Sequence, residues 1–106
     1  MSLNQLSKEV ASFIKNTDEF KAMNKSKSEL DRNRSLKKQF DMYLNKKNNI
    51  YSNYPLDDAS KKVSQLNRDY NDFFKLPAVS NYIQKTKEFN SMMENFYKLI
   101  EKELLK

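Results

Sequence analysis

The last thirty residues of the chain, 77–106, constrain its fold more than any other stretch and read PAVSNYIQKTKEFNSMMENFYKLIEKELLK. Apolar residues recur here every three or four positions, the spacing that places side chains on one face of an α-helix. A helix over residues 78–105 would be about 42 Å long at about 1.5 Å per residue. A compact domain of 106 residues has a radius of gyration of only about 13 Å. We therefore expect this helix to extend past the core of its own subunit.

The apolar face of the terminal helix is the predicted subunit interface. Aromatic and methionine side chains left bare on a projecting helix would favour aggregation, so we expect a second copy or a related subunit to cover them. The alternative is that two other helices of the same subunit, expected at 34–52 and 57–75, cover the whole face. The predicted interface residues are Tyr82, Phe89, Met92, Met93, Phe96, Tyr97 and Ile100.

The absence of glycine, together with the presence of only two prolines, points to an all-α fold. Tight β-hairpin turns and bulges depend on residues that tolerate positive φ, and glycine does so most readily. Amphipathic spacing, helix caps and the breaks at Pro55 and Pro77 predict four to five helices in a dimeric antiparallel bundle with a long C-terminal helix. We expect a single helical domain over residues 1–106, with helices at roughly 3–15, 18–31, 34–52, 57–75 and 78–105.

Histidine and cysteine are both absent from the chain. Their absence removes the commonest general base, thiol chemistry and the usual ligands of zinc and of iron–sulfur clusters. Paired carboxylates such as Asp69 and Asp72 lack the glycine turn of a calcium loop and the Glu-x-x-His pairs of a di-iron bundle, so we interpret them as solvating surface groups. The sequence therefore predicts a protein that is not an enzyme and that has no catalytic, cofactor-binding or metal-binding residues.

The positive charge of the chain is concentrated in residues 21–47. This stretch holds nine basic residues against three acidic ones, and the excess of six equals the net charge of +6 of the whole chain. This concentration of positive charge suits contact with phosphate groups. A protein that binds nucleic acid specifically also needs base-stacking groups beside the charges. Tyr43 lies nearby, yet it falls in register with Phe40 and Leu44, which makes it a core residue.

We therefore favour a solvated face, or a docking surface for an acidic protein, over the alternative of a small basic nucleic-acid-binding protein that uses residues 21–47. The predicted basic docking surface consists of Lys25, Lys27, Arg32, Arg34, Lys37 and Lys38.

No apolar run approaches the ~20 residues that a membrane-spanning helix requires, and the chain does not open with the charged, apolar and small-residue regions of a secretory signal. We therefore expect a cytoplasmic protein without membrane contact. We place no functional weight on residues 1–3.

Three stretches of the chain carry a family resemblance: IKNTDEFKAMNKSKSELDRNRSLKKQFDMY at 14–43, YPLDD at 54–58 and LPAVSNYIQKTKEFNSMMENFYKLIEKEL at 76–104. Within them, the second helix contains an aromatic residue, Phe20. An Asn-x-x-Leu turn runs from Asn33 to Leu36, and the last helix opens with PAVSNYIQKTKEFNSMM. With these motifs, the chain resembles the YlbF/YmcA family of bacterial regulators and its YheA-like relatives over about residues 6–104.

The resemblance implies an all-helical, cytoplasmic regulatory protein that forms homodimers or hetero-oligomers with related family members and has no catalysis of its own. Members of the family are associated with competence, sporulation and biofilm development. In some bacteria they act in a complex that modulates an endoribonuclease during mRNA maturation. The resemblance thus implies an adaptor that acts through helix-mediated protein–protein contacts, with a ribonuclease as a candidate partner. Some family complexes hold iron–sulfur clusters through cysteines, and because this chain has no cysteine, no cluster ligand is carried over.

Overall fold

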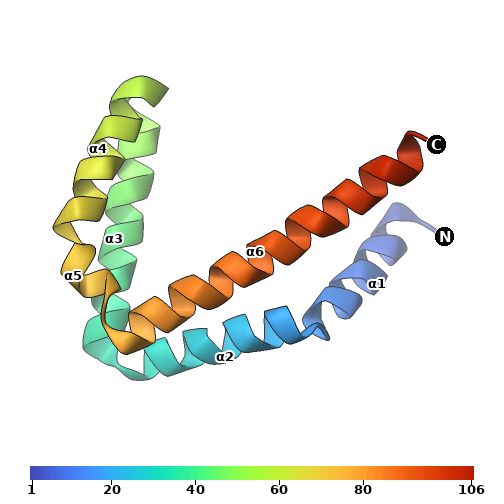
Figure 1. The fold of residues 1–106 in the computed structure, drawn as a ribbon, viewed down its shortest axis with the longest axis horizontal. Coiled ribbons are helices and arrows are strands. Elements are labelled where there is room, and N and C mark those ends of the chain that lie inside the picture. Colours follow the sequence, from blue (N-terminus) through green and yellow to red (C-terminus); the bar gives the residue numbers. More distant parts are fainter. The chain divides into compact units, whose positions relative to one another are not determined.

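The computed structural model describes residues 1–106 and contains six α-helices and no strands (Figure 1). The predicted all-α fold and the long C-terminal helix are confirmed. None of the helices combines the length and the apolarity that a membrane span requires. The elements in chain order are α1 (Leu3–Lys15), α2 (Asp18–Arg32), α3 (Arg34–Asn53), α4 (Leu56–Asp69), α5 (Asn71–Phe74) and α6 (Pro77–Leu104).

The chain is built as two compact units. Unit 1 consists of Met1–Ser28 and Asn81–Lys106, and unit 2 consists of Glu29–Ser80. The helices α2 and α6 each contribute residues to both units. The single folding domain that we expect over residues 1–106 stays a prediction.

The helix ends follow from local chemistry. The side chain of Asn33 caps α3 by accepting a hydrogen bond from the Leu36 N–H at 3.2 Å. Tyr54 has an extended backbone, the conformation favoured before a proline, and Pro55 then directly precedes α4. Pro77 is the first residue of α6, where its missing N–H removes no helical hydrogen bond.

Unit 2 contains the hydrophobic core of the chain. In this unit α3 and α4 pack as a helical hairpin, and α5 continues from the end of α4 (Figure 1). The rings of five aromatic residues on α3, on α5 and at Tyr70 lie within 4.9 to 6.3 Å of one another, measured between centroids of contacting pairs. The buried apolar residues are Leu30, Phe40, Tyr43, Ala59, Val63, Leu66, Phe73 and Val79.

The range predicted as one helix at 57–75 is divided in the structure. Helix α4 ends at Asp69, and Tyr70, with φ −97° and ψ 8°, separates it from the short α5. Beyond this break the ring of Phe74 meets Tyr43 edge-on at 4.9 Å, and the ring of Tyr70 lies 5.2 Å from Tyr43. The chain therefore has six helices rather than four to five, because aromatic packing on α3 favours a local turn that the helical period does not indicate.

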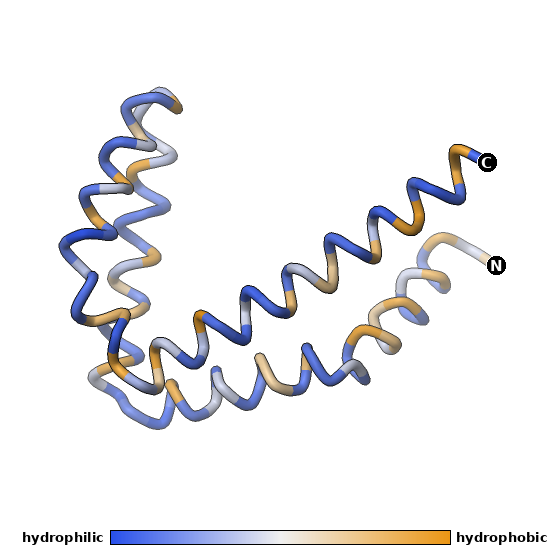
Figure 2. Tube along the Cα trace, in the orientation of Figure 1, coloured by the Kyte–Doolittle hydropathy of each residue, from blue (hydrophilic) through white to orange (hydrophobic).

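Unit 1 buries no apolar residue. Its single buried residue is Ser26 on α2, whose Oγ donates a hydrogen bond to the carbonyl oxygen of Met23 at 2.7 Å. Phe20 on α2 and Phe89 on α6 are only partly buried, although their rings are in contact. Figure 2 shows that apolar and polar residues alternate along α1 and α6. The helices of unit 1 are therefore amphipathic, but they do not enclose a core of their own.

Candidate interaction surfaces

The C-terminal part of α6 leaves an apolar surface uncovered. Every residue from position 97 to position 106 is exposed. The exposed fraction reaches 60% for Tyr97, 62% for Leu99 and 78% for Leu104. These residues occupy one arc of the helix around Ile100, where an open apolar groove of about 380 Å³ is lined by this last part of α6 alone. Such side chains are covered in most proteins by other apolar groups.

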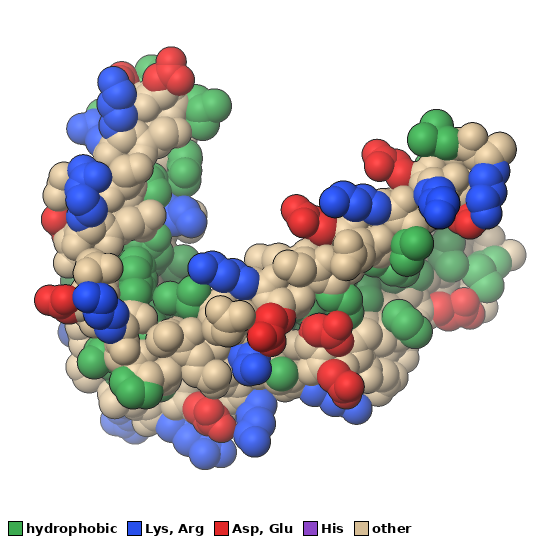
Figure 3. All heavy atoms as spheres, in the orientation of Figure 1, with side chains coloured by type: hydrophobic (Ala, Val, Ile, Leu, Met, Phe, Trp, Pro, Cys, Tyr) green, Lys and Arg blue, Asp and Glu red, His purple; other side chains and the backbone are tan.

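Helix α1 exposes an apolar stripe in the same unit. No residue of α1 is buried, and Phe13 is 65% exposed. Leu6 and Phe13 are seven residues apart, a separation that places both on one face of the helix. Both ends of the chain lie at the same end of unit 1 (Figure 1), and Figure 3 shows hydrophobic side chains gathered between α1 and α6. The unit 1 apolar face is defined here as Leu6, Phe13, Tyr97, Leu99, Ile100 and Leu104.

The seven predicted interface residues fall into two groups in the structure. Tyr97 and Ile100 are exposed, whereas the other five are partly buried. Phe89 is covered on one side by Phe20 of α2, so part of the stripe is covered by a helix that the alternative of coverage by residues 34–52 and 57–75 did not include. The assignment of all seven to a subunit interface stays a prediction. The partly buried group is Tyr82, Phe89, Met92, Met93 and Phe96.

Four members of the unit 1 apolar face are not among the predicted interface residues. Leu6 and Phe13 belong to an amphipathic pattern that predicts a helix, but nothing in that pattern shows that the apolar side stays uncovered. Leu104 belongs to the apolar stripe of the terminal helix but not to the predicted interface, and Leu99 lies outside that stripe. Leu104 lies four residues after Ile100 and Leu99 lies three residues after Phe96, and these separations were the available signal, since residues three and four apart on a helix are neighbours.

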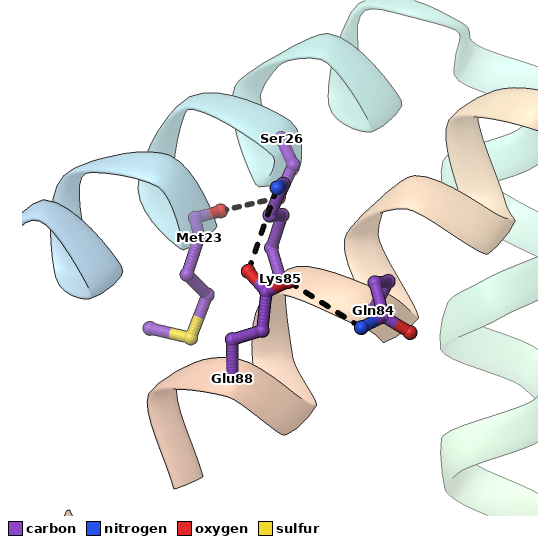
Figure 4. A network of polar contacts seen from close by, with 5 residues as sticks. All are labelled: Met23, Ser26, Gln84, Lys85 and Glu88. Carbon is purple, nitrogen blue, oxygen red and sulfur yellow. Dashed lines mark hydrogen bonds and ion pairs between the residues drawn. The ribbon is translucent and has the colours of Figure 1, made fainter. Parts of the chain in front are cut away.

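Polar side chains of α6 lie beside Met23 and Ser26 of α2 in unit 1 (Figure 4). The Nζ of Lys85 lies 3.4 Å from Oε2 of Glu88, and Gln84 donates a hydrogen bond to Oε1 of the same carboxylate at 3.4 Å (Figure 4). On the same helix, the Oγ1 of Thr86 is buried and has no hydrogen-bond partner. The contact of α6 within unit 1 therefore includes a polar atom that gains nothing from burial.

The predicted basic docking surface is divided between the two units. Lys25 and Lys27 belong to unit 1, and the remaining four residues belong to unit 2. In unit 2, Arg34, Lys37 and Lys38 line one open groove of about 260 Å³ on α3. The structure thus brings together three of the six predicted residues on a single helix face.

The charges in this α3 groove are partly neutralised. The Nζ of Lys37 lies 3.1 Å from Oδ2 of Asp41 one turn later, and the hydrogen bond to that carboxylate raises the pKa of Lys37. Met42 supplies an apolar side chain to the same groove and is 44% exposed. The surface is therefore a mixed basic and apolar one, of the kind that protein partners contact.

Tyr43 is the aromatic residue nearest to the basic stretch, and its prediction as a core residue is confirmed. Its ring is buried, and its hydroxyl donates a hydrogen bond to Oδ1 of Asn67 on α4. Burial raises the pKa of Tyr43, and the neighbouring Tyr51 phenol adds to the shift. Tyr43 therefore holds α3 to α4 and does not present its ring for base stacking.

No group of three or more histidine, cysteine, aspartate or glutamate side chains lies together in a way that could hold a metal ion. The candidate interaction surfaces are the unit 1 apolar face and the α3 groove.

Comparison with known proteins identifies one family. The family model described as "Control of competence regulator ComK, YlbF/YmcA" matches residues 3–104 of the 106. Comparison with curated proteins gave no match, and comparison with solved structures gave none. The family match begins with the first residue of α1 and ends with the last residue of α6.

Proposed function

Because the chain belongs to the YlbF/YmcA family, whose description is the control of the competence regulator ComK, we propose that it is a non-catalytic regulatory adaptor that binds protein through the unit 1 apolar face. The observation that carries this proposal is the exposure of this face, from Phe13 at 65% to Leu104 at 78%. Burying one large apolar side chain contributes about 1.5 to 3 kcal/mol. A partner that covers several of them therefore offsets part of the free-energy cost of association.

The α3 groove is the second part of the proposal. Arg34, Lys37 and Lys38 would contact an acidic region of a client protein, while the unit 1 apolar face holds the regulatory assembly together. The family resemblance supports an endoribonuclease as the client, with an effect on RNA maturation in competence, sporulation or biofilm regulation. The proposed mechanism requires no chemistry from this chain, only simultaneous contact with two proteins.

The test replaces the native chain in its host by a variant with Ile100→Asp and Leu104→Asp. Buried carboxylates oppose association because they lose their hydration, so we expect this variant to lose ComK-dependent reporter expression and to stop co-purifying the ribonuclease. The matched control is Lys98→Glu, which changes the charge of an exposed residue on the opposite side of the same helix. Full reporter expression by a double variant that keeps wild-type helicity and abundance would overturn the proposal.

A further inference from the structure

We propose that the α3 groove is a docking site for an acidic amphipathic helix of another protein, with two carboxylates one turn apart and an apolar side chain one turn further on. This inference rests on the proposed function, which places an acidic region of a client against this groove, and it names the secondary structure and the sequence pattern of that region. The residues that line the groove are all exposed and are Arg34, Lys37, Lys38, Asp41, Met42 and Asn45.

Arg34, Lys38 and Met42 form one row along α3. Successive members are four residues apart, and residues at this spacing are neighbours on one side of a helix. The row is about 12 Å long at about 1.5 Å per residue. Its three members are exposed, whereas Phe40 and Tyr43 of the same helix are buried in the core of unit 2. The row therefore presents two positive charges and then one apolar side chain to an incoming helix.

The charges of the groove select an acidic partner. Three basic residues and one acidic residue line it, which leaves an excess of two positive charges. The acidic residue, Asp41, pairs with Lys37, whose Nζ lies 3.1 Å from its Oδ2. Arg34 and Lys38 take part in no ion pair. These two cations are therefore available to carboxylates of a partner, and complementary charge of this kind favours an acidic protein over a basic one.

The same cations do not stabilise the helix that carries them. Arg34 is the first residue of α3, and the first turn of this helix contains no acidic residue. The beginning of a helix carries partial positive charge, so basic side chains in the first turn oppose the helix dipole. Carboxylates of a partner would relieve this repulsion. The position of the charges thus favours contact with an acidic partner over stabilisation of α3 itself.

The occupant is a helix because the groove offers only side chains. An extended peptide that joins another protein by strand addition pairs its backbone with a sheet edge, and this chain has no strand. A polyproline helix docks in a groove lined by aromatic rings, and no aromatic side chain lines the α3 groove. An α-helix satisfies its own backbone groups. It can pack a row of side chains at the same spacing of four against α3, with about 8 to 10 Å between the helix axes.

The probe is a synthetic peptide with leucine in the middle, glutamates one and two turns away on both sides, and alanine and glutamine elsewhere. Its symmetric order presents the same pattern to α3 in either direction. One control peptide has the same composition in scrambled order, and another has glutamine in place of every glutamate. Each peptide is titrated into the isotope-labelled full chain and followed by nuclear magnetic resonance, which gives both the affinity and the residues contacted.

We expect the patterned peptide to shift the resonances of residues 34–45 and to bind roughly tenfold more tightly than either control peptide. A groove in unit 1 gives an internal comparison. Its charged lining residues are Glu19, Lys87 and Glu88, so carboxylates are in excess there, and its resonances should not move. Shifts confined to the unit 1 groove would contradict the inference.

A pair of matched variants tests the row. Lys38→Glu reverses the charge of an exposed groove residue and should weaken binding of the patterned peptide roughly tenfold. Lys61→Glu makes the same change at an exposed residue of α4 outside the groove and should bind nearly as the wild type does. Near-ultraviolet circular dichroism from the aromatic cluster of unit 2 shows whether each variant remains folded.

A charge exchange gives a gain of binding. A peptide with lysine in place of every glutamate should bind the variant with Arg34→Glu and Lys38→Glu more tightly than it binds the wild type. Equal binding of the patterned peptide by the wild type, the Lys38→Glu variant and the Lys61→Glu variant would overturn the inference.

The inference and the proposed function fail in different ways. Equal affinity for the patterned and the scrambled peptide, lost for both with Lys38→Glu, would show that the helix is wrong while the contact with an acidic region holds. If neither peptide binds, the inference and the α3 part of the proposed function are both wrong. If the patterned peptide binds as expected but a host strain with Lys38→Glu keeps full reporter expression, the docking site holds and its regulatory role is wrong. Tighter binding of a labelled single-stranded RNA than of the patterned peptide, lost with Lys38→Glu, would assign the groove to nucleic acid instead.

Discussion

The ring of Phe20 on α2 meets the ring of Phe89 on α6 edge-on, with 5.8 Å between the ring centroids and 63° between the ring planes. Both rings are partly buried, and they form an aromatic contact between these two helices in unit 1. This ring contact therefore joins α2 to α6 in a unit that has no buried apolar residue.

Phe89→Ala should lower the free energy of unfolding by about 1 to 2 kcal/mol, less than the 3 to 5 kcal/mol of a fully buried phenylalanine, because the ring is only partly enclosed. Urea denaturation followed by circular dichroism measures this change. The control is Asn90→Ala, which changes an exposed neighbour. A double-mutant cycle with Phe20→Ala should give a coupling of about 0.5 to 1.5 kcal/mol, and a coupling of zero would show that the rings contribute independently.

Leu30→Ala should destabilise unit 2 by about 2 to 5 kcal/mol, because Leu30 is only 1% exposed and its truncation leaves a cavity. Leu56→Ala makes the same chemical change at a residue that is 73% exposed and should stay within about 0.5 kcal/mol of the wild type. The denaturation midpoints of the two variants, each compared with that of the wild type, measure these losses. Similar losses at both positions would contradict the location of the core.

Thr86→Val should raise the free energy of unfolding, although it removes a polar group from a helix. The Oγ1 of Thr86 is buried without a hydrogen-bond partner, and such an atom costs about 1 to 3 kcal/mol of desolvation. Valine has the same branched shape without that cost. Thr86→Ser serves as the control, because it keeps the hydroxyl and loses the methyl group. A valine variant that is less stable than the wild type would show that the hydroxyl has a partner in solution.

The stability of the chain should fall at alkaline pH in a way that depends on Tyr43. Burial raises the pKa of Tyr43, so the folded chain holds the phenolic proton more tightly than the unfolded chain. The resulting stability is fully present below the ordinary tyrosine value of about 10 and is lost as the pH rises through the higher folded value.

Tyr43→Phe removes this titration together with the hydrogen bond to Asn67. We expect the variant to be less stable than the wild type at neutral pH by about 0.5 to 1.5 kcal/mol. The difference should narrow in alkali. There only the wild type loses stability, because the phenol of Tyr43 ionises more readily in the unfolded chain than in the folded chain. Urea denaturation of both proteins at neutral and alkaline pH gives the comparison, and a constant difference would contradict the assignment. All other titrating groups are common to the two proteins.

Single-stranded RNA should not bind the α3 groove specifically. Arg34, Lys37 and Lys38 supply charge, but the nearby Tyr43 is buried, and base stacking normally adds about 1 to 3 kcal/mol per base. Fluorescence anisotropy with a labelled oligonucleotide at two salt concentrations should show at most weak, salt-sensitive association. Tight binding that is lost in a Lys37→Glu and Lys38→Glu variant would favour the nucleic-acid alternative instead.

Local signals in the sequence were sufficient for several features of the fold. Asn33 has the side chain that caps a helix, Pro55 forces an extended residue before it, and Pro77 suits the first position of a helix. Each of these effects acts between residues that are neighbours in the chain. The all-α class follows in the same way from the lack of glycine and from the spacing of apolar residues.

The break at Tyr70 could not be read from the sequence, because residues 57–75 keep a helical pattern of apolar positions throughout. What ends α4 at Asp69 is contact of the Tyr70 and Phe74 rings with Tyr43, which lies about thirty residues earlier in the chain. The same limit applies to α1, whose amphipathic pattern predicts a helix with an apolar side. The pattern is identical whether that side is covered or bare.

The sequence by itself therefore determined where helices form and which side of each is apolar, since both depend on residues within a few turns of one another. Only the tertiary structure decided which apolar sides are enclosed. It places the core in Glu29–Ser80 and leaves the stripes of α1 and of the end of α6 exposed. Enclosure depends on contacts between distant segments, whereas a periodic pattern records only the direction in which a side chain leaves its own helix.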